Sequence, residues 1–422
     1  MKRVAIIAAL VAVVVGAVAA VAGGARQASP TKLTVWVGWS AGHELTVFKQ
    51  VAAEYDKAHP DITLNIVGGI TDTKIVAAIR SGQAPEVVSS FNSYNVGIYC
   101  GTGAWRDLAP FMAKSHIKAS MFPAATQYYT QYEGKRCALP LHADTYGLYY
   151  NTTLFKKAGI KGPPKTMTEL AADAKKLTEK NSDGSFKVVG LDPMIGFYEN
   201  VPERWVAAFG AKRTDAKGNS ILSKQPGWAK WLKWHKSLLD WYGYKNLVKF
   251  QAGLGDEFSS SMAFEIGKLA MVMDGEWRVA FIQNEHPELY GSGYINGTII
   301  GLPKNGGHVD QAWDLVKYLT TNTHALAVLS NGLRNVPSTS ASTRSKELTP
   351  DAHFAPFLKI FSHPKSGTSP ITASGQSYIN LVQQFVIKYQ AGKVKDLAAG
   401  LRDTDKQLDA QVKQAKGGGG VP

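Results

Sequence analysis

Hydrophobic positions near the start of the chain alternate between the period of a strand and that of a helix. Apolar residues at 33–37, 62–66 and 86–91 predict three short strands. Apolar positions over 47–55 recur at helical spacing, and a second helix is predicted over 71–80. Strands that alternate with helices in this way are typical of a parallel α/β sheet. We therefore predict an α/β fold with mainly parallel sheets flanked by helices.

The ends of these strands are the first candidate ligand positions. In open parallel sheets, ligands bind outside the carboxyl ends of the strands. Trp39 and Ser40 follow the first predicted strand, and Ser90 and Asn92 lie at the end of the third. We therefore expect these loops to face a ligand.

A different pattern marks residues 137–170. Pro140 and Asp144 are poor strand residues inside what otherwise reads as one strand, so the chain is predicted to bend or to cross a gap there. The apolar run at 148–150 then fits a buried strand, and Asn151 or Thr152 is placed to cap the next helix. The strand is thus expected to bend or cross a gap in its first half and to be buried in its second half.

Aromatic and aliphatic residues recur at helical spacing between Trp228 and Tyr242. A stripe of this kind is more typical of a core-facing helix than of a ligand site. His235 lies on the stripe and is interpreted as a buried core histidine. Trp234 and Trp241 fall off the stripe, so we expect them at the surface.

Length and charge narrow the class of protein. The chain has 422 residues, enough for two or three domains, and a formal net charge of +14. The lysines are scattered, and no basic run interleaves with aromatic residues as in a nucleic-acid-binding surface. We therefore expect no nucleic-acid partner. The positive charge favours a weak attraction to an anionic cell envelope.

The N-terminal residues 1–28 have the pattern of a signal peptide. Lys2 and Arg3 precede an apolar stretch over 4–22, and small residues such as Ala28 offer cleavage points. Export to the periplasm or the extracellular face of the membrane follows. The apolar stretch approaches the length of a membrane span, so an uncleaved anchor is the alternative. No cysteine follows the stretch, so lipid attachment is not expected.

The chain has only two cysteines, Cys100 and Cys137, and both lie in the exported part. An even number of cysteines in an oxidising compartment predicts a disulfide, which would contribute about 3–4 kcal/mol by constraining the unfolded chain. Two buried free thiols are the alternative. Because no histidine pair stands at ligand spacing, we expect no zinc site, and no other metal or cofactor.

Several motifs together resemble one protein family. Pro140, Asp144 and the Tyr-Tyr-Asn run ending at Asn151 are followed by Pro-Pro and Glu-Leu at family spacing. The segment 264–278 contains Gly-Lys-Leu-Ala-Met and Asp-Gly-Glu-Trp, and 333–338 resembles a third family segment. This combination resembles the bacterial ABC-transporter extracellular solute-binding proteins of family 1, the sugar-binding, maltose-binding-protein-like family.

The resemblance implies a two-lobe periplasmic-binding-protein-like fold of type II. Residues 30–142 and 297–342 would form the first lobe, and residues 146–293 and 346–416 the second, joined by a hinge of crossing segments. Residues 417–422 are glycine-rich and are expected to form a flexible tail.

One stretch departs from the family pattern. Only residues 279–289 separate Arg278 from Tyr290, whereas the family has a longer stretch with a proline-bearing strand. The second lobe is therefore expected to lack an edge strand.

The resemblance, combined with the strand-end rule, assigns a set of ligand-binding residues. Aromatic rings suit the apolar faces of sugars, and carboxylate, hydroxyl and amide groups suit their hydroxyls. Core packing is the alternative role for Trp277, and a hinge bond to backbone is the alternative for Asp144. The candidates are Trp39, Ser40, Ser90, Asn92, Asp144, Tyr198, Glu199, Trp277 and Arg278.

The expected function is that of a substrate-binding component of an ABC importer. Such a protein would capture a sugar or oligosaccharide in the interlobe cleft by hinge closure, without catalysis, and deliver it to the transmembrane permease subunits. We expect a monomer. The alternatives are a non-sugar solute, such as ferric iron held by paired tyrosines, a sensor subunit, and a glycoside-acting enzyme with paired carboxylates.

Overall fold

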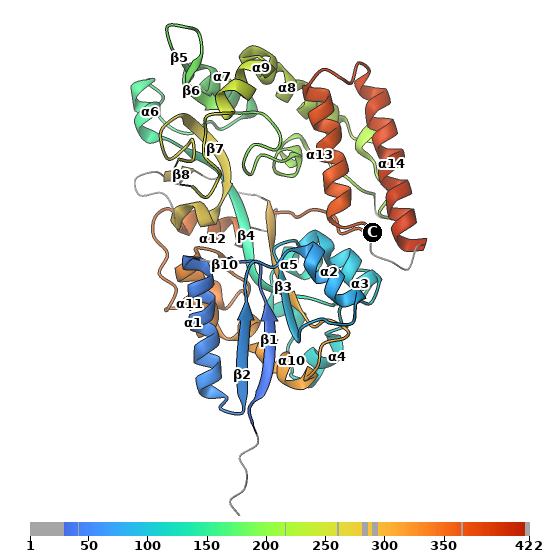
Figure 1. Cartoon of the computed structure of the whole chain (residues 1–422). Coiled ribbons are helices and arrows are strands. Elements are labelled where there is room, and N and C mark those ends of the chain that lie inside the picture. Colours follow the sequence, from blue (N-terminus) through green and yellow to red (C-terminus); the bar gives the residue numbers. More distant parts are fainter. Residues whose placement is uncertain are drawn as a thin grey trace, which may run out of the picture.

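A computed structural model gives the structure of residues 29–417, apart from residues 41, 216, 260, 281–285, 289–293 and 364–365. Two lobes lie end to end, and the long strand β4 (Leu139–Tyr150) runs from one into the other (Figure 1). The predicted signal peptide lies outside the described residues, as does the tail beyond Gly417. Within the described part of the chain, no helix is both long and apolar enough to span a membrane.

The first lobe, at the bottom of Figure 1, is built on three parallel strands. Strand β1 pairs with β2 on one side, with Leu33 opposite Leu64, and with β3 on the other, with Val35 opposite Val87. The elements of this lobe are β1 (Thr31–Trp36), α1 (His43–Ala58), β2 (Ile62–Val67), α2 (Asp72–Arg80), β3 (Val87–Ser90), α3 (Val96–Gly101), α4 (Ala109–Lys114), α5 (Ala124–Tyr129), α10 (Val309–Thr321) and α11 (Thr323–Leu333).

The predicted alternation of strands and helices is confirmed in this lobe. All the apolar positions of the 47–55 stretch are buried on one face of α1. At its N-terminus, α2 is capped by the Thr71 side chain, which accepts a hydrogen bond from the Lys74 backbone. Gly82 has a φ of +72° just past the end of this helix, a conformation that glycine adopts without strain.

Strand β4 crosses between the lobes and pairs with a different antiparallel strand in each. Strand β9 (Ile295–Gly301) pairs with residues 139–145 of β4, and β7 (Leu269–Gly275) pairs with residues 146–150. Asp144 and Thr145 therefore lie where β4 passes from one lobe to the other. The pairing register shifts between Pro140 and His142, which confirms the bend predicted near Pro140.

The sheets are mixed. The parallel order expected from the sequence holds for β1–β3 and for β6 with β7, whereas the crossing strands add antiparallel pairs. Strand β10 (Val336–Pro337) also pairs antiparallel with β4, opposite Ala143 and His142, so three segments meet at the crossing. The lobe boundaries drawn from the sequence stay a prediction.

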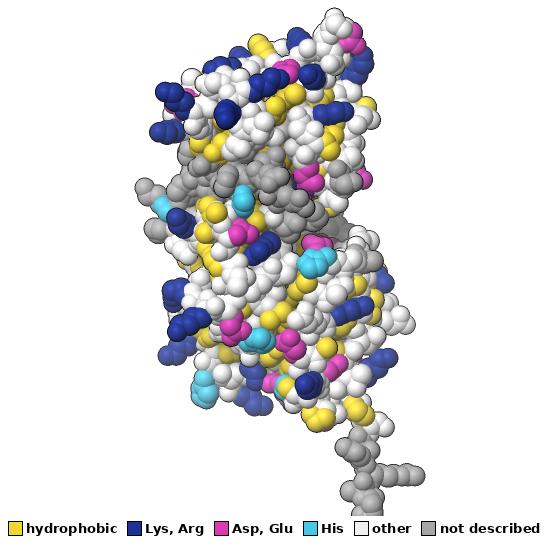
Figure 2. Space-filling view, turned by 90° about the vertical axis from the view of Figure 1, so that its left-hand side faces the viewer, with side chains coloured by type: hydrophobic (Ala, Val, Ile, Leu, Met, Phe, Trp, Pro, Cys, Tyr) yellow, Lys and Arg dark blue, Asp and Glu magenta, His cyan; other side chains and the backbone are white. Residues whose placement is uncertain are grey.

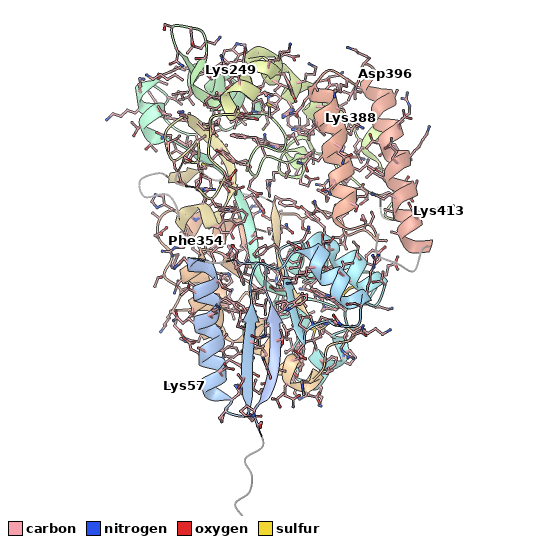
Figure 3. All side chains as sticks on the ribbon, in the orientation of Figure 1. Lys57, Lys249, Phe354, Lys388, Asp396 and Lys413 are labelled. Atoms are coloured by element: carbon pink, nitrogen blue, oxygen red, sulfur yellow. A yellow bond between two sulfur atoms is a disulfide. The ribbon has the colours of Figure 1, made fainter. Side chains whose placement is uncertain are left out.

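Helix α12 (Ala355–Ser362) packs against β4 near this crossing. Phe354, at its start, is fully buried and lies between the two lobes in Figure 3. Lys57 in α1 and Lys249 lie at opposite ends of the molecule in the same view, so the long axis runs across both lobes. Lysine and arginine side chains are spread along this length in Figure 2.

The second lobe surrounds a short sheet in the order β4-β7-β6-β5. Its elements are α6 (Thr152–Lys157), α7 (Met167–Lys176), β5 (Glu179–Lys180), β6 (Phe186–Leu191), α8 (Pro226–Tyr242), α9 (Tyr244–Gln251), β7 (Leu269–Gly275), α13 (Gln376–Gln390) and α14 (Leu397–Gly417). In the described part of this lobe, short 3₁₀ helices join them, namely η3 (Pro202–Arg204), η4 (Val206–Phe209), η5 (Leu222–Lys224) and η6 (Glu276–Ala280).

The apolar stripe of α8 is buried throughout, including His235, which confirms its interpretation as core. Trp241 is 45% exposed, as expected for a residue off the stripe. Trp234 differs from the expectation, because its indole packs against Trp205 and Phe209 and its Nε1 donates to the Met167 carbonyl. Trp205, between η3 and η4, and Phe209, in η4, supply the extra apolar surface that covers it.

Two further features bear on stability. The disulfide between Cys100 and Cys137 is present, with 5.5 Å between the Cα atoms, and it ties the end of α3 to the residues before β4. On the free edge of the second-lobe part of β4, the three-residue strand β8 (His286–Glu288) pairs with Leu148–Tyr150. The expectation that this lobe lacks an edge strand is therefore wrong, because residues 286–288 form a short one on this edge.

Candidate functional site

A cavity of about 950 Å³ lies beside the second-lobe half of β4. Tyr146, Gly147 and Leu148 of β4 form one wall, and Tyr128 of α5 reaches it from the first lobe. The remaining wall comes from the start of α7, the η3–η4 segment, the loop after it, Tyr294 before β9, and the loop at 367–370. The cavity therefore takes residues from both lobes and from a crossing segment.

Arg204 lines the cavity and contacts both an aromatic ring and a carboxylate. Its guanidinium carbon lies 3.7 Å from the centre of the Tyr146 ring, a cation–π contact. Its terminal nitrogens bind the Glu199 carboxylate and the Glu199 carbonyl. This arrangement holds a charged group and an aromatic face together at the cavity wall.

A second buried ion pair lies in the same wall. Arg213 Nη2 is 2.9 Å from Glu203 Oε1, and both side chains are almost fully buried. Close by, the Tyr294 hydroxyl is within 2.8 Å of Ser369 Oγ and also bonds to the Tyr94 hydroxyl of the first lobe. Residues that are about 200 positions apart in sequence therefore meet at this point.

Two carboxyl groups meet where β4 crosses between the lobes. Asn335 Nδ2 donates to Asp144 Oδ1 at 3.0 Å and to Glu276 Oε1 at 2.9 Å. The Thr145 backbone also donates to Glu276 Oε2 at 2.6 Å. Burial, together with the Asp144 carboxylate, raises the pKa of Glu276 well above its ordinary value. This favours the protonated form of Glu276, which lessens the repulsion between the two groups.

Trp277 follows Glu276 directly and is half-buried. Its ring lies edge-on to the Tyr146 ring, with 5.3 Å between centroids and 90° between planes. Because Tyr146 lines the cavity, Trp277 stands one contact away from it.

The predicted residues of the first lobe have different surroundings. Trp39 is 3% exposed and packs against Phe48, Phe91 and His142. The Ser90 hydroxyl donates to Asp72, and Ser90 also accepts from the Asn92 backbone. Ser40 is exposed.

Two predicted residues of the second lobe are engaged within that lobe. The Tyr198 hydroxyl donates to the Gly255 carbonyl at 2.8 Å and accepts from the Ala263 backbone at 3.0 Å. Arg278 is fully buried and binds Asp274 at 2.7 Å and Glu265 at 2.8 Å. The Arg278–Asp274 contact spans the turn that carries Trp277.

Of the predicted ligand-binding residues, Glu199 and Trp277 contact side chains that line the cavity, Arg204 and Tyr146 respectively. Asp144 lies at the crossing beside them, and the others lie farther off or are held by the fold. Their ligand roles stay predictions.

Sequence reasoning missed the Arg204, Arg213, Glu203 and Tyr294 cluster. A charged Pro-Glu-Arg-Trp run at 202–205, directly after the predicted Tyr198–Glu199 pair, was the available signal. No group of three or more His, Cys, Asp or Glu side chains in the described part of the chain is arranged to hold a metal ion.

Comparison with known proteins decides the family. Residues 50–356 match the model of the bacterial extracellular solute-binding protein family. The chain belongs to this family. The match runs from within α1 to the start of α12, so it covers β4, β9 and most of the cavity wall and ends before the loop at 367–370.

Individual relatives share between about a fifth and a quarter of their aligned residues with this chain, or slightly more. The maltotriose-binding protein of Pyrococcus abyssi is 22% identical over 357 residues, 79% of this chain and 73% of that protein. The sn-glycerol-3-phosphate-binding periplasmic protein UgpB of Brucella abortus is 28% identical over 163 residues, 36% and 37% of the two chains. The solved structure of CpMnBP1 with mannotriose bound is 26% identical, with a TM-score of 0.78, over 90% of this chain and all of that one.

Proposed function

We propose that this protein is the extracytoplasmic substrate-binding component of an ABC importer, and that it captures a sugar or oligosaccharide between its lobes. The cavity beside β4 carries this proposal, because it combines aromatic faces, hydrogen-bonding groups and residues of both lobes. Its volume of about 950 Å³ is large enough for an oligosaccharide. Similarity to proteins named for maltotriose and mannotriose binding supports a sugar as ligand.

Closure of the lobes would complete the site. Tyr146 and Trp277 would receive the apolar face of a sugar ring, while Arg204, Glu203 and Ser369 offer donors and acceptors for its hydroxyls. Strand β4 is continuous from one lobe into the other, so a change of a few backbone angles at the crossing would move the lobes as rigid bodies.

We also propose that the sugar is released unchanged to the permease. The carboxyl pair of Asp144 and Glu276 is buried and tied by Asn335, an arrangement suited to holding the crossing rather than to exchanging protons with water. A sensor subunit would bind its sugar at the same site. Transport assays with the permease distinguish a sensor from a component of an importer.

Fluorescence titration of the purified chain with mono- and oligosaccharides tests the binding function. A ligand that closes the lobes around Trp277 should shift the tryptophan emission saturably. Trp277→Ala should weaken binding about tenfold, because it removes an aromatic contact. Trp241→Ala, which changes an exposed tryptophan outside the cavity, is the matched control. A folded chain that binds no sugar in the series would contradict the proposal.

A further inference from the structure

The two arginines of the cavity wall have hydrogen-bonding capacity that the protein does not use. Arg213 is 5% exposed, and its Nη1 has no hydrogen-bond partner among the described residues. The Nε of Arg204, whose side chain is also buried, is likewise without a partner in that part of the chain. A buried donor left unpaired is costly, so each of these atoms favours a hydrogen-bond acceptor. Because both arginines line the cavity, a ligand there is the candidate for that acceptor.

The charges that line the cavity are unbalanced. Lys165, Arg204, Lys212 and Arg213 line it, against one acidic side chain, Glu203. The buried ion pairs neutralise Arg204 with Glu199 and Arg213 with Glu203. The two lysines are exposed, and neither has an ion-pair partner among the described residues. The cavity therefore keeps an excess of positive charge at its rim.

These two observations point to the same ligand chemistry. A guanidinium group binds a carboxylate or phosphate more strongly than it binds a neutral hydroxyl, because the bond is charge-assisted. The lysines would raise the local concentration of an anion from solution. Glu203 opposes an anion, and neither of its carboxylate oxygens has a hydrogen-bond partner among the described residues. Its ion pair with Arg213 Nη2 offsets its charge and leaves Arg213 Nη1 unpaired.

We propose that the sugar captured in this cavity carries an anionic group, a carboxylate or a phosphate, which Arg213 Nη1 and Arg204 Nε bind. This inference rests on the proposed function, since it assigns the substrate class of the same cavity. Tyr146 would receive the sugar ring, and the anionic group would lie toward Lys212.

Calorimetric titration of the full chain with pairs of neutral and acidic sugars tests the proposed preference for an anionic ligand. The probes are glucose, galactose and mannose, the corresponding uronic acids, the corresponding 6-phosphates, and neutral and uronic oligosaccharides. We expect one acidic ligand to bind about 10- to 100-fold more tightly than its neutral counterpart, the gain that a charge-assisted bond gives. Uronic acids and phosphates tell which anion fits. Affinity should also fall as sodium chloride is raised from low to physiological concentration.

Two variants connect the preference to the cavity. Lys212→Gln should reduce the preference for the acidic ligand several-fold, whereas Lys249→Gln, the same charge change at the far end of the second lobe (Figure 3), should leave it unchanged. Arg213→Gln should abolish it. The Arg213→Gln change leaves the buried Glu203 without its ion-pair partner and can therefore destabilise the fold. Lys212 is exposed, so the Lys212→Gln variant tests the preference without this effect.

The outcomes separate the two proposals. Neutral sugars that bind as tightly as acidic ones, with affinity insensitive to salt, would overturn the anionic ligand and leave the sugar-binding function standing. Failure of both kinds of sugar to bind a folded chain would overturn the function and this inference together.

Discussion

Single buried side chains set much of the chemistry of this protein. His235 lies inside α8, where its Nε2 contacts the Pro193 carbonyl and its ring faces Gln390. Burial lowers its pKa from 6.5 to about 4. Nearby, burial raises the pKa of Asp192 from 3.8 to about 7, although Gln251 donates to it. Both groups are therefore neutral in the folded core under mildly acidic conditions.

The His235 shift has a defined sign in the pH dependence of stability. Since the unfolded chain takes up a proton near pH 6.5 and the folded chain only near pH 4, the stabilisation from neutral His235 is complete above about pH 6.5. It is lost as the pH falls toward 4. Between pH 6.5 and pH 4, the free energy of unfolding of the parent chain should lose about 3 kcal/mol through His235, as the pKa shift implies. The His235→Gln variant should not show this loss. Urea unfolding at pH 7 and pH 4.5 measures it.

Asp192 acts in the opposite direction, since a raised pKa makes its contribution fall as the pH rises from 3.8 to 7. It is present in both the parent and the variant, so it cancels in the comparison. His43→Gln, at an exposed histidine, serves as the control. A parent and variant with the same pH dependence would contradict the assignment.

At the scale of elements, close backbone approach decides how the second lobe packs. Gly190 lies in β6 where α7 crosses it, and an added Cβ there would stand 1.9 Å from the Ala174 carbonyl oxygen. Because the contact is with backbone, a rotamer change cannot relieve it. The small residue therefore lets the helix lie directly on the strand.

Gly190→Ala should destabilise the chain by about 1–3 kcal/mol, the range for overpacking in a core. Gly162→Ala, where an added Cβ meets no atom within 4 Å, should change stability by less than about 0.5 kcal/mol. Thermal unfolding of both variants measures the difference. Equal melting temperatures would show that α7 can move away from β6 at little cost.

On the scale of the whole molecule, the two lobes are joined by β4, β9 and β10, which meet at Asp144 and Ala143. Three crossings of this kind restrict relative motion to a hinge. The cavity takes Tyr128 from one lobe and most of its wall from the other, so it changes shape when the lobes move.

A bound ligand should therefore make the chain both more compact and more stable. At a ligand concentration 100 times the Kd, unfolding should cost about 2.7 kcal/mol more than in the free chain. The radius of gyration measured by small-angle X-ray scattering should fall at the same concentration. Stabilisation without a change in the radius would mean that the ligand binds one lobe and does not close the hinge.

The sequence by itself determined the α/β class, the strands β1–β3, the buried faces of α1 and α8, the bend at Pro140, the disulfide and the family. Each of these depends on local periodicity, on a short motif or on a cysteine count, all of which neighbouring residues carry.

Only the tertiary structure decided which side chains form the cavity. Arg204 lies on Tyr146, and Tyr294 meets Tyr94, because crossing strands bring together segments far apart in the chain. Local patterns contain no information on such pairs, so the sequence analysis placed both Trp39 and Trp277 among the ligand candidates. Burial then separated them: packing encloses the first, while the second stands beside the cavity.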